Sequence, residues 1–220
     1  MLHLSFVTGT EPGKWFERYR DRTTYGLETT PSDDPLAQLL DPSDPTNLAL
    51  VRLPDERALS DTLHLVRLYE ESPGVALPKE HTLTLFEPVP VAELAGEHAN
   101  YLFPSAAPGD IAALRDALGV VAANVGYATG PRPLLKVLSG KQIEHRELAG
   151  ADFATQIALV WHKTDDGEMI QDFVGIAKGR TLASSRQADQ RKKPTKKRVK
   201  KPGQRPAKKA SGNRGGRKRK

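Results

Sequence analysis

Apolar and polar residues alternate at the start of the chain, and apolar residues then recur at helical spacing. The alternation over residues 2–7 predicts a strand. Trp15, Phe16 and Tyr19 lie at positions i, i+1 and i+4, which places them on one face of a short helix. Thr10 is the predicted N-cap of that helix, because a threonine hydroxyl can accept from the free N–H groups of a first turn.

Predicted strands and helices continue to alternate through the next thirty residues. A second strand is predicted over 25–29, followed by a helix that Asp34 caps. The proline-rich segment 41–45 ends this helix, since proline cannot continue one. Residues 48–51 are continuously apolar, as expected of a parallel strand buried on both faces. The order βαβαβ predicts a parallel sheet with right-handed crossovers.

The second half repeats the alternation of strands and helices. A strand over 63–69 leads into residues 72–78, where Pro73 and Gly74 predict a bent, extended crossing between two lobes. A clear helix begins after Asp110 and ends near Asn124–Gly126, where Asn or Gly can adopt a left-handed conformation. Further short elements are predicted at 90–95, 101–103, 144–148, 156–161 and 169–179.

The periodic pattern ends near Thr181, and the charge changes sign there. Residues 186–220 contain 17 Lys or Arg and one acid, Asp189, a net charge of +16. The whole chain carries +6, so the preceding residues carry about −10. A segment this polar cannot bury enough surface to offset the entropy of ordering. We therefore expect a folded acidic body, residues 1–181, and a disordered basic tail, residues 182–220.

Four phrases in the body resemble the effector-binding domain of LysR-type transcriptional regulators. They are Leu2–Val7 followed by Thr8-Gly9-Thr10, Asn47–Arg52, Tyr69–Leu83, and Val121–Gly126 with Pro131. Asn47, Thr82 and Asn124 depart from the residues usual in the family. The resemblance covers about residues 1–181.

The resemblance implies an α/β fold of the two-lobe, type II periplasmic-binding-protein-like kind. It implies lobe I at about 1–76 and 157–181, and lobe II at about 77–156. The chain starts where the family's effector domain starts, so we expect no N-terminal helix-turn-helix. The resemblance therefore does not imply that this chain recognises an operator sequence through a helix-turn-helix, as the family's full-length members do.

A small-molecule site is expected between the lobes, near the ends of the strands. Threonine hydroxyls and backbone N–H groups at a helix start can hold an anion, and an arginine can pair with it. The alternatives are ordinary capping, a surface arginine and core packing. The predicted ligand-binding residues are Thr8, Gly9, Thr10, Arg52, Phe103, Ser105 and Tyr127.

The basic tail predicts a nucleic-acid partner, because clustered Lys and Arg neutralise phosphates with little regard to base sequence. Its Gly, Pro and Arg pattern matches minor-groove hooks only weakly, and it has no aromatic residue to stack on bases. A merely solubilising tail is the alternative. The predicted nucleic-acid-binding residues are Arg191, Lys192, Lys193, Lys196, Lys197, Arg198, Lys200, Lys201, Arg205, Lys208, Lys209, Arg214, Arg217, Lys218, Arg219 and Lys220.

Other classes of function are disfavoured. The chain has no cysteine, which removes disulfides, zinc–thiolate sites and thiol catalysis. Its six histidines show no metal-binding spacing, and no nucleophile elbow or phosphate-binding loop is present. We expect no catalytic residue, no metal and no cofactor. No signal peptide and no membrane-spanning run is recognisable, so we expect a cytoplasmic protein.

These observations predict a non-catalytic, ligand-binding protein of transcription regulation, with nucleic acid bound through the tail. The alternative is an architectural, nucleoid-type DNA-binding protein whose cleft is vestigial. Family effector domains pair antiparallel, so the resemblance also implies a homodimer. The helix with Trp15 and the helix after Asp110 are the expected dimer elements.

Overall fold

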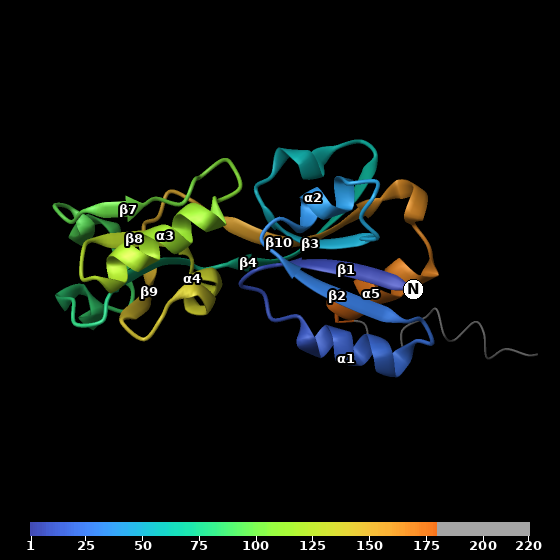
Figure 1. The fold of residues 1–220 in the computed structure, drawn as a ribbon, viewed down its shortest axis with the longest axis horizontal. Coiled ribbons are helices and arrows are strands. Elements are labelled where there is room, and N and C mark those ends of the chain that lie inside the picture. Colours follow the sequence, from blue (N-terminus) through green and yellow to red (C-terminus); the bar gives the residue numbers. More distant parts are fainter. Residues whose placement is uncertain (180–220) are drawn as a thin grey trace, which may run out of the picture. The chain divides into compact units, whose positions relative to one another are not determined.

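The computed structural model describes residues 1–179, and these residues belong to one compact unit, Met1–Thr181. Two five-stranded sheets stand side by side within it, each covered by helices (Figure 1). The predicted disorder after Thr181 and every predicted nucleic-acid-binding residue lie outside the described residues.

The first sheet forms lobe I and has the strand order β2–β1–β3–β10–β4. β1 pairs parallel with β2 and β3, as the βαβαβ order predicts, whereas β10 runs antiparallel to β3 and β4. The strands are β1 Leu2–Val7, β2 Leu27–Ser32, β3 Leu48–Leu53, β4 Leu63–Glu71 and β10 Thr155–His162, and the helices are α1 Gly13–Arg22, α2 Pro35–Leu40 and α5 Glu168–Ala177.

The second sheet forms lobe II and has the order β6–β9–β5–β8–β7. Its central strand β5 is antiparallel to both neighbours, and the short edge strands β6 and β7 are parallel to theirs. The strands are β5 Pro73–Pro78, β6 Val89–Pro90, β7 Ala99–Tyr101, β8 Tyr127–Pro131 and β9 Ile143–Ala149, and the helices are α3 Ile111–Ala122 and α4 Arg132–Leu138. Short 3₁₀ helices are Glu56–Leu59, Thr82–Leu85, Val91–Leu94 and Lys163–Asp165.

The chain crosses between the lobes twice, along β4 into β5 and from β9 back into β10 (Figure 1). We expected the lobes to divide near residues 76 and 157. The pairing instead places the first division at Ser72 and the second between Ala149 and Thr155, because Pro73–Pro78 hydrogen-bonds wholly within the second sheet. Lobe II is thus one continuous segment, and lobe I consists of two.

Strand β3 shows why lobe I has two cores. All six of its residues are buried. Leu48 and Leu50 face the cluster under α1 and α5, while Ala49 and Val51 face the cluster under α2. A strand with helices on both faces needs apolar residues on both sides, as in the continuous run 48–51, and the buried Arg52 that follows is paired with Glu71.

Local signals located several helix ends correctly. Asp34 accepts from the Ala37 N–H and Asp110 from the Ala113 N–H, as N-caps do. Asn124 takes the left-handed conformation, with φ of 69°. The Thr10 cap was wrong: α1 begins at Gly13, and the Thr10 hydroxyl donates to the Val7 carbonyl within the preceding turn.

The apolar faces of the two expected dimer helices are core. Phe16 and Tyr19 of α1 pack in the lobe I cluster, and burial raises the pKa of Tyr19 to about 12. The apolar stripe of α3 lies in the lobe II cluster, with Leu114 and Val121 fully buried. These stripes therefore stabilise the lobes themselves and provide no argument for pairing.

Candidate ligand site between the lobes

A cavity of about 190 Å³ lies between the lobes. Lobe I contributes the ends of β1 and β3 and the start of α2, and lobe II contributes the loop from Phe103 to Ile111. We call it the interlobe cavity. Its lining includes Val7, Asp33, Asp34, Val51, Arg52, Leu53, Asp55, Arg57, Phe103, Ala107, Pro108, Gly109 and Asp110.

Arg52 is one of two buried charged residues in the lining of this cavity, and Asp55 is the other. Its Nε donates to Glu71 Oε2 at 2.6 Å, and its Nη2 donates to Glu71 Oε1 at 3.0 Å. The two side chains are only 6% and 1% exposed. Nη2 also donates to the Thr8 carbonyl, and the Thr155 hydroxyl donates to Glu71. Because Glu71 and Thr155 flank the two crossings, Arg52 anchors both connections to lobe I.

One atom of this arginine has no partner. Nη1 of Arg52 is buried and makes no hydrogen bond to any residue of the described chain. A buried donor without a partner costs about 1–3 kcal/mol.

A second ion pair joins the two lobes directly. Asp33, which follows β2 in lobe I, accepts two hydrogen bonds from Arg115 of α3 in lobe II, one of them at 2.8 Å. The Thr8 hydroxyl donates to Asp33 as well. The Arg115 hydrogen bonds, with that of Thr8, hold the pKa of Asp33 below its ordinary value. We call the Asp33–Arg115 pair the latch.

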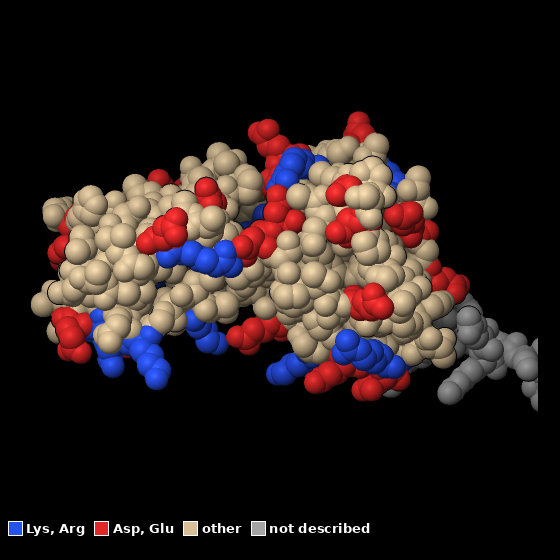
Figure 2. Space-filling model, in the orientation of Figure 1, with Lys and Arg blue, Asp and Glu red and all other residues tan. Residues whose placement is uncertain are grey.

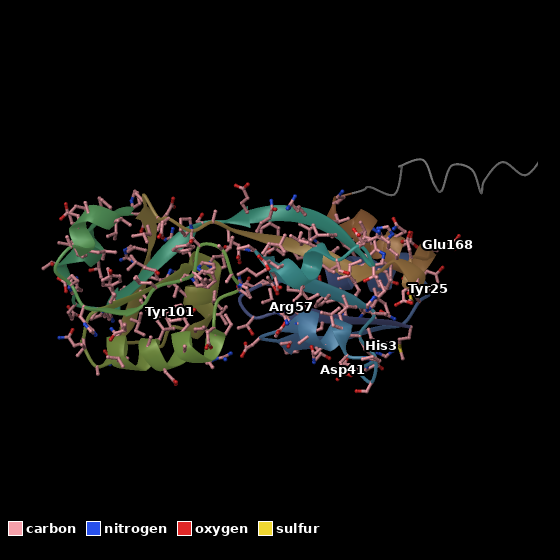
Figure 3. All side chains as sticks on the ribbon, turned by 90° about the horizontal axis from the view of Figure 1, so that it is seen from above. His3, Tyr25, Asp41, Arg57, Tyr101 and Glu168 are labelled. Atoms are coloured by element: carbon pink, nitrogen blue, oxygen red, sulfur yellow. The ribbon has the colours of Figure 1, made fainter. Side chains whose placement is uncertain are left out.

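A third group of charges surrounds Arg57, at the end of lobe I that faces lobe II (Figure 3). Its guanidinium donates to Asp55 at 2.6 Å and to Asp34 at 2.9 Å, and these carboxylates raise the pKa of Arg57. Figure 2 shows acidic side chains gathered with basic ones at the junction of the lobes. The charges at the junction are therefore largely neutralised by one another.

The predicted residues do not all meet in this cavity. Arg52 and Phe103 line it, and Thr8 and Gly9 lie beside Arg52. Thr10 is tied to Val7, Ser105 lines a separate exposed groove near Leu59, and Tyr127 lines a cavity within lobe II. The Thr8 hydroxyl and the Arg52 guanidinium were expected to bind an anion, but both are paired to carboxylates of the protein. Sequence spacing carries no signal of such long-range partners.

Gly9 has a role that only its backbone explains. Its φ is +94°, and an added Cβ would lie 2.8 Å from the Leu134 Cα in lobe II. Only glycine fits a left-handed position this close to another backbone. Gly9 thus permits the close approach of the lobes.

Size and polarity define what the interlobe cavity can hold. A cavity of about 150 Å³ accommodates benzene, so this one fits a molecule slightly larger. Val7, Val51 and Phe103 give it apolar walls. Its charged lining residues are Arg52, Arg57 and the four carboxylates Asp33, Asp34, Asp55 and Asp110. A small, mostly apolar molecule matches the size and the apolar walls of this cavity.

The part of the chain that the structure describes has neither a metal-binding cluster nor a membrane-spanning helix. Across residues 1–179, no three His, Asp or Glu side chains are grouped as a metal ion would require. Over the same range, no helix is both long and apolar enough to cross a membrane.

The latch supports a testable prediction. Replacing Arg115 with Gln should widen the distribution of interlobe distances at neutral pH, while the free energy of unfolding falls by only about 1 kcal/mol or less, because the pair is half exposed. The chain lacks cysteines, so fluorophores on one introduced cysteine in each lobe can measure the distance by energy transfer.

Asp116→Asn, a charge change one position along the exposed face of α3, is the matched control and should leave the distance unchanged. The latch should also depend on pH. Because the folded pKa of Asp33 is depressed, its contribution is complete above the ordinary carboxyl pKa and is lost as the pH falls through the folded value. Equal distance distributions in Arg115→Gln and the parent chain would contradict a latch.

Comparison with solved structures shows which fold this is. The effector-binding domain of BenM with its effector benzoate matches with a TM-score of 0.60 and 16% identity, over 80% of this chain and 89% of that one. The regulatory domain of MetR, a LysR family regulator from N. meningitidis, matches with a TM-score of 0.52 and 16% identity, over 81% and 93%. No protein-family model and no curated protein sequence matches the chain.

Full-length regulators match over a smaller share of their length. CbnR in complex with its target DNA gives a TM-score of 0.58 at 14% identity, covering 80% of this chain and 69% of that one. The chain spans 65% of full-length BenM. At these identities the likeness establishes the fold, and it confirms the predicted two-lobe architecture of LysR effector-binding domains.

Proposed function

We propose that this chain is a non-catalytic sensor of the LysR effector-domain type. It binds a small effector between its lobes and associates with nucleic acid through residues 182–220, in transcription regulation. The supporting observation is the interlobe cavity, where the buried Arg52 retains one unpartnered donor in a fold that BenM uses to bind benzoate.

The effector that fits best is a small aromatic or aliphatic carboxylate. Its carboxylate would accept from Arg52, and its apolar part would contact Val51 and Phe103. Binding would stabilise the closed arrangement that the latch already favours, by mass action on the closed state.

Thermal unfolding with a panel of small carboxylates, benzoate included, tests the proposal. A ligand at a hundred times its Kd stabilises the folded state by about 2.7 kcal/mol, which a melting curve resolves. Ala107→Trp places a large side chain in the cavity from an exposed position and should remove the stabilisation. Ala106→Trp adds the same ring at an exposed position outside the lining and should preserve it.

A second function is supported by a specific observation. Thr8 and Arg52, predicted to bind a ligand, instead satisfy Asp33 and Glu71. This internal pairing favours an architectural DNA-binding protein with a vestigial cleft. No stabilisation across a broad panel, together with unchanged DNA binding by Ala107→Trp, would select this alternative.

A homodimer remains a prediction of the proposal. Two tails on one particle would raise avidity, because the second tail binds at a high effective concentration. Sedimentation of the whole chain at several concentrations checks the oligomeric state. A monomer at all of them would remove the avidity argument.

A further inference from the structure

We propose that a second cavity, separate from the interlobe cavity, binds a small oxyanion and does so more tightly as the pH falls. This cavity has a volume of about 530 Å³ and shares no lining residue with the interlobe cavity. We call it the basic cavity. The residues that matter to the argument are Glu11, Tyr69, Ser72, Arg132, Lys136 and His145.

Donors converge on the basic cavity from three elements. Arg132 and Lys136 come from α4, His145 comes from β9, and Tyr69 comes from the crossing strand β4. Burial raises the pKa of Tyr69 to about 12, so its hydroxyl keeps its proton throughout the physiological range. Cationic and neutral donors around one space are the arrangement that binds carboxylate, sulfate or phosphate oxygens.

His145 lines the cavity and has one ring nitrogen with an unmet hydrogen bond. Its Nδ1 is buried and finds no partner among residues 1–179. Burial lowers the pKa of His145, and the positive charges of Arg132, Arg146 and Lys136 lower it further, against an opposing effect of Glu144. The imidazole is therefore neutral near pH 7, in surroundings whose net effect on it is cationic.

The carboxylates nearby do not block the site. Arg132 pairs with Glu87 at 3.1 Å and with Glu147 at 3.8 Å, and Lys136 pairs with Glu11 at 3.4 Å. Glu87 and Glu11 are 53% and 74% exposed, and such solvated pairs contribute about 1 kcal/mol or less. An oxyanion within the cavity can exchange for them at low cost.

The pH dependence follows from the charge of the ligand. An anion beside His145 favours the imidazolium form, so binding raises the histidine pKa, and protonation in turn tightens binding. The charged or titratable groups around His145 are Arg132 and Lys136 of α4, Glu144, Arg146 and Glu147 of β9, Glu87, which pairs with both arginines, and Tyr69 and Glu11 across the cavity. Strand β5, which pairs with β9, contains no titratable residue.

The test uses the whole chain and inorganic sulfate, whose charge is constant between pH 6 and pH 8. Sulfate replaces chloride at fixed ionic strength, and the His145 ring resonances are followed by NMR. We expect a saturable shift, with sulfate bound more tightly at pH 6 than at pH 8. For a rise of about one unit in the histidine pKa on binding the gain stays below tenfold, because the full factor develops only below the lowered pKa of the free imidazole. Acetate in place of sulfate shows which oxyanions the cavity accepts: saturation by both indicates that carboxylates and tetrahedral anions bind, and saturation by sulfate alone indicates that only tetrahedral anions do.

Variants distinguish sulfate binding in the basic cavity from sulfate binding by the basic tail, which also attracts anions. Lys136→Gln and Arg132→Gln should weaken sulfate binding at both pH values. Lys141→Gln, at an exposed position outside the cavity, removes the same charge and should not. His145→Asn or His145→Gln should abolish the pH dependence.

Equal effects of Lys136→Gln and Lys141→Gln would overturn the proposal, since sulfate would then be bound elsewhere. Absence of saturation at His145 would also overturn it. Ala107→Trp, which fills the interlobe cavity, should leave sulfate binding intact, so failure of the proposed effector site and failure of this one give different results.

Discussion

Deletion of residues 182–220 is expected to abolish the binding of duplex DNA at physiological salt. The remaining body carries about −10 and has no net attraction for phosphates, whereas the removed segment carries most of the positive charge of the chain. If the tail neutralises six to ten phosphates, the intact chain should lose about 10³ to 10⁵ in affinity between 50 and 200 mM salt. The measurement is a salt titration of binding, by anisotropy, for the intact and truncated chains with DNA and with RNA.

A charge-matched variant sharpens this experiment. Changing the predicted nucleic-acid-binding Lys and Arg residues to Gln keeps the length of the tail but removes its charge, and it should behave as the deletion does. A truncated chain that keeps a steep salt dependence would instead place the nucleic-acid contact on the body. The body could also compete with DNA for its own tail, and the isolated tail peptide should then bind the truncated chain in a salt-dependent way.

Arg52→Met should lower the free energy of unfolding by about 3–5 kcal/mol, because it leaves the carboxylate of Glu71 buried without its charge partner. Thr155 would still donate to that carboxylate, but a neutral hydroxyl does not compensate a charge in a site only 1% exposed. Urea unfolding measures the effect. Because Arg52 anchors both crossings, we also expect a broader distribution of interlobe distances.

The double variant Arg52→Met/Glu71→Leu is the control. Replacing a buried ion pair by apolar side chains of similar size is often neutral, so the double variant should recover most of the lost stability. A single variant that loses less than about 1 kcal/mol would show that Glu71 finds another partner or reaches solvent. A double variant as unstable as the single would assign the loss to packing.

Structural features that depend on neighbouring residues were predictable from the sequence, whereas those that depend on distant residues were not. Asp34, Asp110 and Asn124 were predicted correctly because a cap or a left-handed residue depends only on its neighbours along the chain. The continuous apolar run of β3 was likewise sufficient to indicate a strand buried on both faces. With the resemblance to LysR effector domains, these local signals predicted the two-lobe fold.

The candidate site was predicted less well, because the residues that hydrogen-bond to one another there are far apart in sequence. Asp33 and Arg115 are separated by 82 residues, and Glu71 and Thr155 by 84. Strand β8 and helix α4 also escaped prediction, since Gly130, Pro131 and Pro133 weaken the local signals for both elements. Pro133 is nevertheless tolerated, because the first turn of a helix needs no N–H from it.

The place of β10 in the first sheet sets the order in which the protein can assemble on the ribosome. β10 lies between β3 and β4 and hydrogen-bonds to both, yet it begins only at Thr155. Until that residue emerges, the nascent chain exposes two strands with open edges that cannot yet join. Lobe II, continuous from Pro73 to Ala149, is complete before then. Lobe II is therefore expected to fold first, and the later synthesis of β10 and α5 then completes the sheet and the core of lobe I.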